Sequence, residues 1–108
     1  MSKYLFIQSQ DPFTESRARH QFELIGQLHE AGHDVSVLLV QNGVTPARRG
    51  ARGEGLDQLL NREVSIYADV FSLEQRELDE SDLKDRIIVS GLHIIIDAML
   101  ARGKVIWH

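Results

Sequence analysis

Hydrophobic residues along the chain fall into short continuous runs that alternate with segments of helical periodicity. The continuous runs lie at residues 4–8, 34–40, 64–68, 87–89 and 104–107. Short runs rich in β-branched and aromatic residues predict strands. The run at 34–40 is apolar at nearly every position, as expected of a strand covered on both faces. The pattern therefore predicts about five strands.

The first helical segment spans residues 15–31. Its apolar positions recur every three or four residues, at Ala18, Phe22, Ile25 and Leu28. Asp11 or Thr14 is its expected N-cap, and Gly32 suits the left-handed position that ends a helix. Gly26 costs about 1 kcal/mol relative to alanine inside a helix. A close approach of this helix to the sheet is one reason to tolerate that cost.

Further helices are predicted at 55–62, 73–78 and 91–101, with a helix start or turn at 81–85 and a loop at 44–55. Successive strand, helix and strand form a βαβ unit with a right-handed crossover. The alternation predicts a single α/β domain over residues 1–108. We expect a three-layer α/β/α sandwich in a flavodoxin-like arrangement, with a mostly parallel sheet of about five strands.

The C-terminal apolar stretch, residues 87–100, is interrupted by polar residues and is shorter than the ~20 residues of a membrane span. Its helix is expected to use Ile94, Ile95, Ala98 and Met99 as the apolar side. The stretch is either buried by the sheet or, where it lies outside the core, part of an oligomer interface. With no membrane span and no secretory signal apparent, we expect a cytoplasmic protein.

The chain is mildly acidic overall, and its charged residues are unevenly distributed. A formal net charge of −4 argues against broad binding to nucleic acid or anionic membranes. Segment 45–62 carries four arginines against two acidic residues, whereas segment 69–85 carries seven acidic residues against two basic ones. Such asymmetry favours electrostatic association with another copy or a partner. The alternative is two independently solvated surfaces.

The chain has no cysteine, which removes several chemistries from consideration. Disulfides, thiolate zinc sites, iron–sulfur clusters and cysteine nucleophiles all require that residue. His29 and His33 are four residues apart, a spacing that would place them on one face of a helix. Because Gly32 is expected to end the helix between them, this pair is not expected to bind a metal. We therefore expect no metal and no cofactor. His93, set among isoleucines, is interpreted as a hydrogen-bonded boundary residue.

Candidate site residues follow from the expected sheet. In open parallel sheets, ligands bind beyond the carboxyl ends of the strands. Those ends carry four polar candidates: Ser9, Gln10, Asn42 and Asp69. This rule ranks positions without naming a reaction, because one fold supports many functions. No base that would pair with Asp69 in acid–base catalysis is apparent in the sequence.

The loop at 46–55 places three arginines, Arg48, Arg49 and Arg52, among glycines. Forked guanidinium donors and exposed backbone N–H groups suit an anion, and the helix that follows adds a favourable dipole. Neither of the common nucleotide-binding glycine motifs is present. The alternatives are a mobile polar loop and a loop ordered only at a subunit contact.

Several short motifs occur in a fixed order along the chain. Ala31-Gly32-His33 leads into Val35 of the second strand, Gly43-Val44 follows that strand, and 63–69 and 104–107 form later strands. In this order, and over nearly the whole chain, the motifs resemble the DsrE/DsrF-like (YchN, Tus-type) sulfur-relay family. The resemblance implies a DsrE-like α/β sandwich.

Members of that family with a cysteine resemble sulfur carriers, in which a thiolate accepts sulfane sulfur as a persulfide. The resemblance places the cysteine position at Asp69, or at Ala68 if the register shifts by one. A carboxylate cannot form a persulfide. The resemblance therefore implies the family's scaffold without its thiol chemistry, and the sequence favours a protein that is not an enzyme.

The resemblance also implies assembly, because the family includes cysteine-free subunits of hetero-oligomers and its members form trimers and hexamers. We expect a non-catalytic binding or partner subunit associated with sulfur relay, either a homo-oligomer or a hetero-oligomer with a related subunit. The alternative is a small-anion or small-molecule binding protein, or an enzyme, that uses Asp69 with the arginines of the 46–55 loop.

Overall fold

The computed structural model describes residues 2–13 and 17–108. Five parallel strands form one sheet in the order β4-β3-β2-β1-β5. The strands are β1 (Lys3–Gln8), β2 (Asp34–Leu39), β3 (Ser65–Asp69), β4 (Ile87–Ser90) and β5 (Lys104–Trp107). The α-helices are α1 (Arg17–Glu30), α2 (Glu54–Asn61), α3 (Val70–Gln75) and α4 (His93–Leu100). The 3-10 helices are η1 (Gln41–Ala47) and η2 (Glu80–Asp82).

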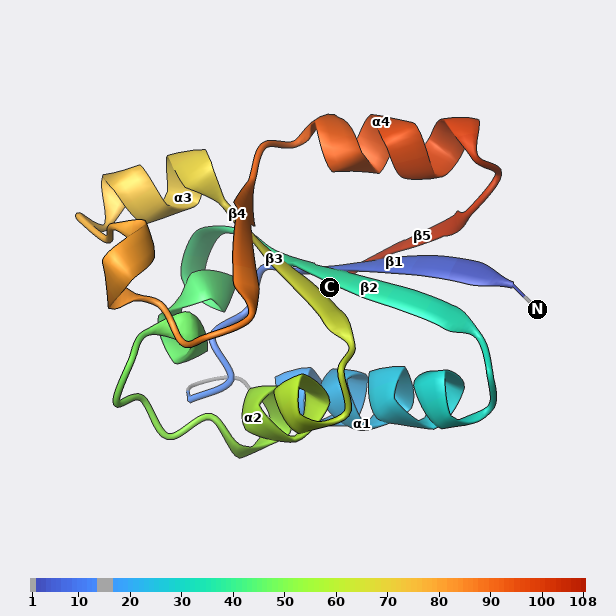
Figure 1. The fold of residues 1–108 in the computed structure, drawn as a ribbon, viewed down its shortest axis with the longest axis horizontal. Helices are drawn as coiled ribbons and strands as arrows, with labels where there is room; N and C mark the ends of the chain where they lie inside the picture. Colours follow the sequence, from blue (N-terminus) through green and yellow to red (C-terminus); the bar gives the residue numbers. More distant parts are fainter. Residues whose placement is uncertain (1, 14–16) are drawn as a thin grey trace.

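The helices cover the sheet from two sides, with α1 and α2 on one face and α4 on the other (Figure 1). The strand order explains this division. The chain moves in one direction from β1 through β2 and β3 to β4, and then returns across the whole sheet to β5. Right-handed crossovers in opposite directions place their helices on opposite faces. The predicted α/β/α sandwich with a five-stranded parallel sheet is confirmed.

The larger core lies between the sheet and the α1/α2 pair. Alternate strand residues, including Phe6, Val37 and Ile66, are fully buried there, because successive side chains of a strand point to opposite faces. Phe22 and Ile25 of α1 pack against them at the predicted helical spacing. The α2 residues of this core are Leu56, Leu59 and Leu60.

The core on the α4 side is smaller. Its buried residues are Leu5, Ile7, Leu38 and Val40. Ile94, Ile95 and Ala98 pack against these, as predicted for the apolar side of the helix. Met99 was predicted on the same side, but 60% of it is exposed. No residue of α4 is buried, which distinguishes this helix from α1 and α2.

Two glycines, one within and one just after the first helical segment, have roles predicted from the sequence, and the structure confirms one of them. Gly32 has a φ of +91° just after α1, as predicted for a residue that ends the helix. For Gly26 the sequence suggests a close approach to the sheet, but its nearest neighbours are Leu59 of α2 and Arg62 just after that helix. A Cβ there would lie 2.7 Å from an Arg62 guanidinium nitrogen and 3.7 Å from Leu59 Cδ2. The space beside Gly26 is thus occupied by the end of the flexible Arg62 side chain, whereas Leu59 lies at ordinary van der Waals distance.

The segment after β2 is more ordered than the loop predicted at 44–55. Residues 41–47 form η1, in which Gly43, Val44, Pro46 and Ala47 are buried. A Cβ on Gly43 would overlap the carbonyl oxygen of Gln8, so only glycine fits this crossing. Helix α3 begins at Val70, three residues before its predicted start. The N-cap predicted at Thr14, and the predicted start of the first helix at 15, lie outside the described residues.

Candidate functional site

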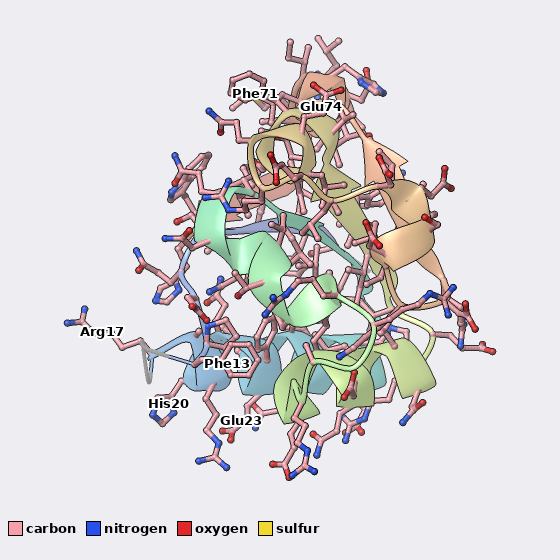
Figure 2. All side chains as sticks on the ribbon, turned by 90° about the vertical axis from the view of Figure 1, so that its left-hand side faces the viewer. Phe13, Arg17, His20, Glu23, Phe71 and Glu74 are labelled. Atoms are coloured by element: carbon pink, nitrogen blue, oxygen red, sulfur yellow. The ribbon has the colours of Figure 1, made fainter. Side chains whose placement is uncertain are left out.

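The carboxyl ends of all five strands meet along one edge of the sheet, which faces the viewer in Figure 2. The predicted rim residues Ser9, Gln10, Asn42 and Asp69 follow or end three of these strands. Their placement at strand ends agrees with the rule for parallel sheets. What each side chain contacts decides which of them is available to a ligand.

Asp69 ends β3 and caps helix α3. Its Oδ2 accepts hydrogen bonds from the Ser72 backbone N–H at 3.0 Å and from the Ser72 hydroxyl at 2.7 Å. The residue is 4% exposed. An Asp at the N-cap satisfies an N–H group that has no partner within the helix. The geometry therefore gives Asp69 a structural contact. The sequence indication is an Asp followed by Ser three positions later.

Ser72 and Arg76 extend the Asp69 contact to η1. The Ser72 hydroxyl accepts a hydrogen bond from the Gln41 N–H at 2.8 Å. Arg76 donates to the side-chain oxygen of Asn42 at 2.9 Å and to the Ser72 carbonyl at 3.1 Å. The amide of Asn42 is thus engaged by a guanidinium that sequence reasoning did not single out. These bonds join α3 to the segment after β2.

At the other end of the rim, the residues after β1 bind the residue after β5. The Ser9 N–H and hydroxyl donate to the His108 carbonyl at 2.7 and 2.9 Å. The Gln8 side chain is fully buried and donates to the Gln10 carbonyl at 3.1 Å. Its Oε1 lies 3.3 Å from Nδ1 of His108. Sequence reasoning missed Gln8 and His108, because their pairing spans the length of the chain.

The three loop arginines do not converge on one point. Arg48 donates to the Thr45 carbonyl at 3.0 Å. Arg49 donates to the Ser81 carbonyl at 3.1 Å and pairs with the Asp85 carboxylate at 2.9 Å. Arg52 borders a cavity instead. The sequence predicts that the basic loop and the acidic segment are surfaces for a partner or are independently solvated. In the structure they contact each other within the chain.

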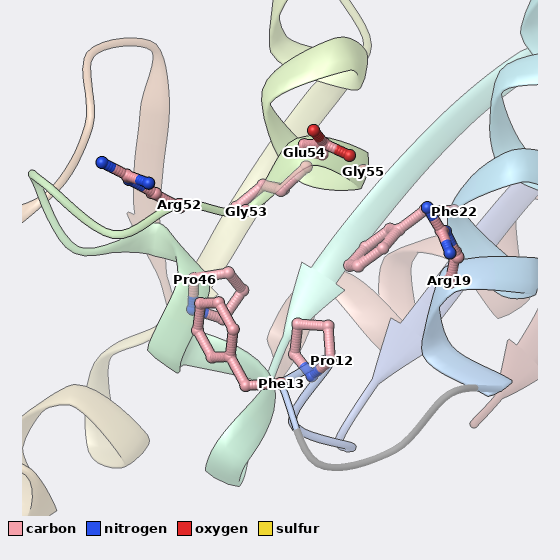
Figure 3. Close-up of a pocket in the computed structure, with 10 residues that line it drawn as sticks. Pro12, Phe13, Arg19, Phe22, Pro46, Arg52, Gly53, Glu54 and Gly55 are labelled. Atoms are coloured by element: carbon pink, nitrogen blue, oxygen red, sulfur yellow. The ribbon is translucent and has the colours of Figure 1, made fainter.

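The cavity beside Arg52 has a volume of about 530 Å³. It lies between the start of α1, the start of α2, η1 and the segment after β1 (Figure 3). Its lining residues are Pro12, Phe13, Arg19, Phe22, Pro46, Arg52, Gly53, Glu54, Gly55 and Leu56. Cavities of about 300–1,000 Å³ with mostly apolar walls and a few polar groups are typical of small-molecule sites. Sequence reasoning found Arg52 but missed Arg19.

Among the described residues, no group of three or more His, Cys, Asp or Glu side chains could hold a metal ion. His33 accepts a hydrogen bond from the Ser2 N–H at 3.2 Å and packs edge-on against Tyr4. His93, interpreted from the sequence as a boundary residue, is exposed at the start of α4.

Comparison with known proteins gives a family and two close folds. A family model described as "DsrE/DsrF-like family" matches residues 2–107. A protein of unknown function from Methanobacterium thermoautotrophicum has a similar structure, with a TM-score of 0.84 and 20% identity over the whole of both chains. The YchN protein from E. coli gives a TM-score of 0.86 and 18% identity, again over the whole of both chains. No curated protein matches the sequence.

Proposed function

The chain belongs to the DsrE/DsrF-like family, and we propose that within it the protein acts as a cytoplasmic, oligomeric binding or partner subunit associated with sulfur relay. It carries no persulfide of its own. Its partner copies are either identical chains, as in a trimer or hexamer, or a related subunit. This proposal rests on the missing thiol and on one uncovered helix.

The missing thiol supports a role without sulfur carriage. The 108 residues contain no cysteine, and no other side chain can both accept and release sulfane sulfur as a thiolate does. At the two positions where the family resemblance would place it, Ala68 is fully buried and Asp69 caps a helix. The end of β3 therefore contributes to packing and to capping of α3.

The observation that carries the proposal is that α4 buries none of its own residues. Trp107 is in register with Ile7, and Ile88 is in register with Tyr67, so both lie on the α4 face of the sheet. Four large apolar residues are exposed on α4 or just before it, and two more lie on the opposite edge strands of this face: Leu92, Ile96, Met99 and Leu100, with Ile88 on β4 and Trp107 on β5. We call these six residues the α4 surface. Large exposed apolar patches mark interaction sites.

Sedimentation velocity and light scattering test the assembly. We expect the purified protein to form a stable oligomer and Ile96→Asp to shift it towards the monomer, because a buried unpaired charge opposes association. Leu24→Asp is the matched control, since Leu24 is an exposed apolar residue of α1, on the other face. If only assembly with a related subunit occurs, a pull-down will recover that subunit and Ile96→Asp will abolish its recovery. A monomer that recovers no related subunit contradicts the proposal.

Sulfur loading tests the second half of the proposal. We expect the protein to retain no cyanide-reactive sulfur after incubation with a low-molecular-weight persulfide and removal of the donor. A thiol-bearing relative treated in parallel provides the positive control. Sulfur transfer to an acceptor by this protein alone, above a protein-free control, would refute the non-catalytic role.

A second candidate function is small-anion or small-molecule binding near the arginine loop. The observation that favours it is the cavity bordered by Arg52. Asp69, Arg48 and Arg49 are engaged in other contacts, so Arg52 is the loop residue that this function would use. A thermal-shift series with sulfate, phosphate and organic acids tests it, because a ligand at 100 times its Kd adds about 2.7 kcal/mol to stability.

A further inference from the structure

We propose that the cavity between α1, η1 and α2 binds a small monoanionic organic acid with a flat apolar body. This inference deepens the second candidate function, on which it rests, by naming the site and the chemical class of the ligand. It is separate from assembly through the α4 surface, which lies on the opposite face of the sheet from α1 and α2 (Figure 1).

The apolar part of the site comes from four rings contributed by three segments. Pro12 and Phe13 follow β1, Phe22 lies on α1, and Pro46 lies in η1. Phe22 is buried, whereas Phe13 is 51% exposed although it is a large aromatic residue. Figure 3 shows these rings around one cavity. Aromatic rings pack favourably against another flat ring, in stacked or edge-on arrangements.

Two arginines that the rest of the described structure leaves unengaged lie on opposite sides of the cavity (Figure 3). Arg19 and Arg52 border the cavity and have no hydrogen-bond or ion-pair partner among the described residues. Five other arginines bind oxygen atoms of the protein: Arg48, Arg49, Arg62, Arg76 and Arg86. Arg102, which lies outside the cavity lining, also has no partner among the described residues, so it is the bordering of the cavity that distinguishes Arg19 and Arg52. Guanidinium groups bind carboxylates and sulfonates through charge-assisted hydrogen bonds.

The charge balance of the lining indicates the charge of the ligand. Arg19 and Arg52 contribute two positive charges, and Glu54 contributes one negative charge, so the lining has a formal charge of +1. A monoanion neutralises this lining, whereas a dianion leaves an excess negative charge next to Glu54. The charge balance therefore favours a carboxylate or sulfonate over a phosphate dianion.

The backbone beside the cavity is held by close packing. A Cβ on Gly53 would lie 3.0 Å from Pro46 Cβ, and a Cβ on Gly55 would lie 2.8 Å from Phe22 Cδ2. Such contacts fix the start of α2 against the rings that line the cavity. A wall formed before binding reduces the ordering cost that a ligand must offset.

Naphthoate is the probe, and naphthamide is its neutral analogue of nearly the same shape. We expect naphthoate to bind saturably in titrations followed by two-dimensional amide NMR, with the largest shifts at Phe13, Gly53 and Gly55. Naphthamide should bind at least about tenfold more weakly, because hydrogen bonds to a charged group are stronger than those to a neutral one. Binding on the α4 surface alone, or equal affinity for both probes, would overturn the inference.

Charge variants locate the site. The double variant Arg19→Gln/Arg52→Gln should weaken naphthoate binding at least about tenfold. The double variant Lys3→Gln/Arg102→Gln removes the same charge from side chains outside this lining and should leave binding unchanged. Equal loss in both variants would show a general charge effect and would refute the site. Amide spectra of the unliganded variants verify folding.

Titrations with sulfate and phosphate distinguish a wrong ligand class from a failure of anion binding at this cavity. If either ion binds, loses affinity in the Arg19→Gln/Arg52→Gln variant, and naphthoate does not bind, then anion binding stands and the proposed ligand class is wrong. If no anion binds, both fail. Phe13→Ala should weaken naphthoate several-fold and leave sulfate unaffected, because the substitution removes apolar contact only.

Discussion

The two faces of the sheet are completed in different ways. On one face, α1 and α2 bury seven residues between them, and a continuous core joins them to the strands. On the other, α4 covers four buried strand residues but none of its own residues is buried. The first face is an ordinary protein core, whereas the second leaves apolar surface exposed. If assembly uses the α4 surface, as proposed, then stability and association are divided between the two faces.

The largest expected effect compares two isoleucines in helices. Ile25 of α1 is fully buried, whereas Ile96 of α4 is 60% exposed. We expect Ile25→Ala to lower the free energy of unfolding by about 2–5 kcal/mol, because it removes packed methyl groups and leaves a cavity. Ile96→Ala should change it by less than about 1 kcal/mol in the monomer. Urea denaturation measures both, and similar losses would remove the distinction between the faces.

The next effect concerns the acidic residues Asp69 and Asp97. Asp69→Ala should destabilise the protein by about 1–2 kcal/mol, because it removes a helix cap with two hydrogen bonds to Ser72. Asp97 lies exposed on α4, so Asp97→Ala should be near neutral. Urea denaturation of the two variants checks the difference. A neutral Asp69→Ala would reopen a functional role for that carboxylate.

A stabilising effect is expected where α1 meets α2. Gly26→Ala should raise the free energy of unfolding by about 0.5–1 kcal/mol, since alanine is the better helix former. The nearest obstacle is the guanidinium end of Arg62, a flexible and partly exposed side chain that can move aside. Thermal and urea unfolding measure the gain. A loss of more than about 1 kcal/mol would mean that the helix contact is tighter than the flexibility of Arg62 allows.

The smallest effect is expected for the pair between Arg49 and Asp85. Both side chains are mostly exposed, so the coupling in a double-mutant cycle should be about 0.2–1 kcal/mol and should decrease with added salt. Lys84–Asp57 provides the comparison, because its lysine is largely buried and its coupling should be larger. Equal coupling would show that burial does not distinguish the two pairs.

The helices and strands could be predicted because their patterns are local. The five apolar runs and the spacing of Ala18, Phe22 and Ile25 each specify an element within a few residues. The order of motifs also identified the family. Helix η1 was missed because glycine and proline within 41–47 read as a loop, whereas burial against β1 determines its conformation.

The candidate site was predicted less well, because it depends on contacts between distant segments. Asp69 was placed correctly at a strand end, but its capping role became clear only with Ser72 in position. The arginine loop was interpreted as one anion site, yet Arg49 turns to Asp85 and Arg52 to a cavity. Arg19 is 33 residues from Arg52, and no local pattern relates them.

The position of β5 at the edge of the sheet, beside β1, affects how the protein folds during synthesis. Strand β5 pairs only with β1, with Tyr4 in register with Lys104 and Ile7 with Trp107. During synthesis from the N-terminus, β1 therefore has an open side until residues 104–107 have emerged. Contacts between the ends of a chain slow folding and prolong the exposure of unpaired strand edges. The nascent protein thus carries an open strand edge on β1 until β5 is available to pair with it.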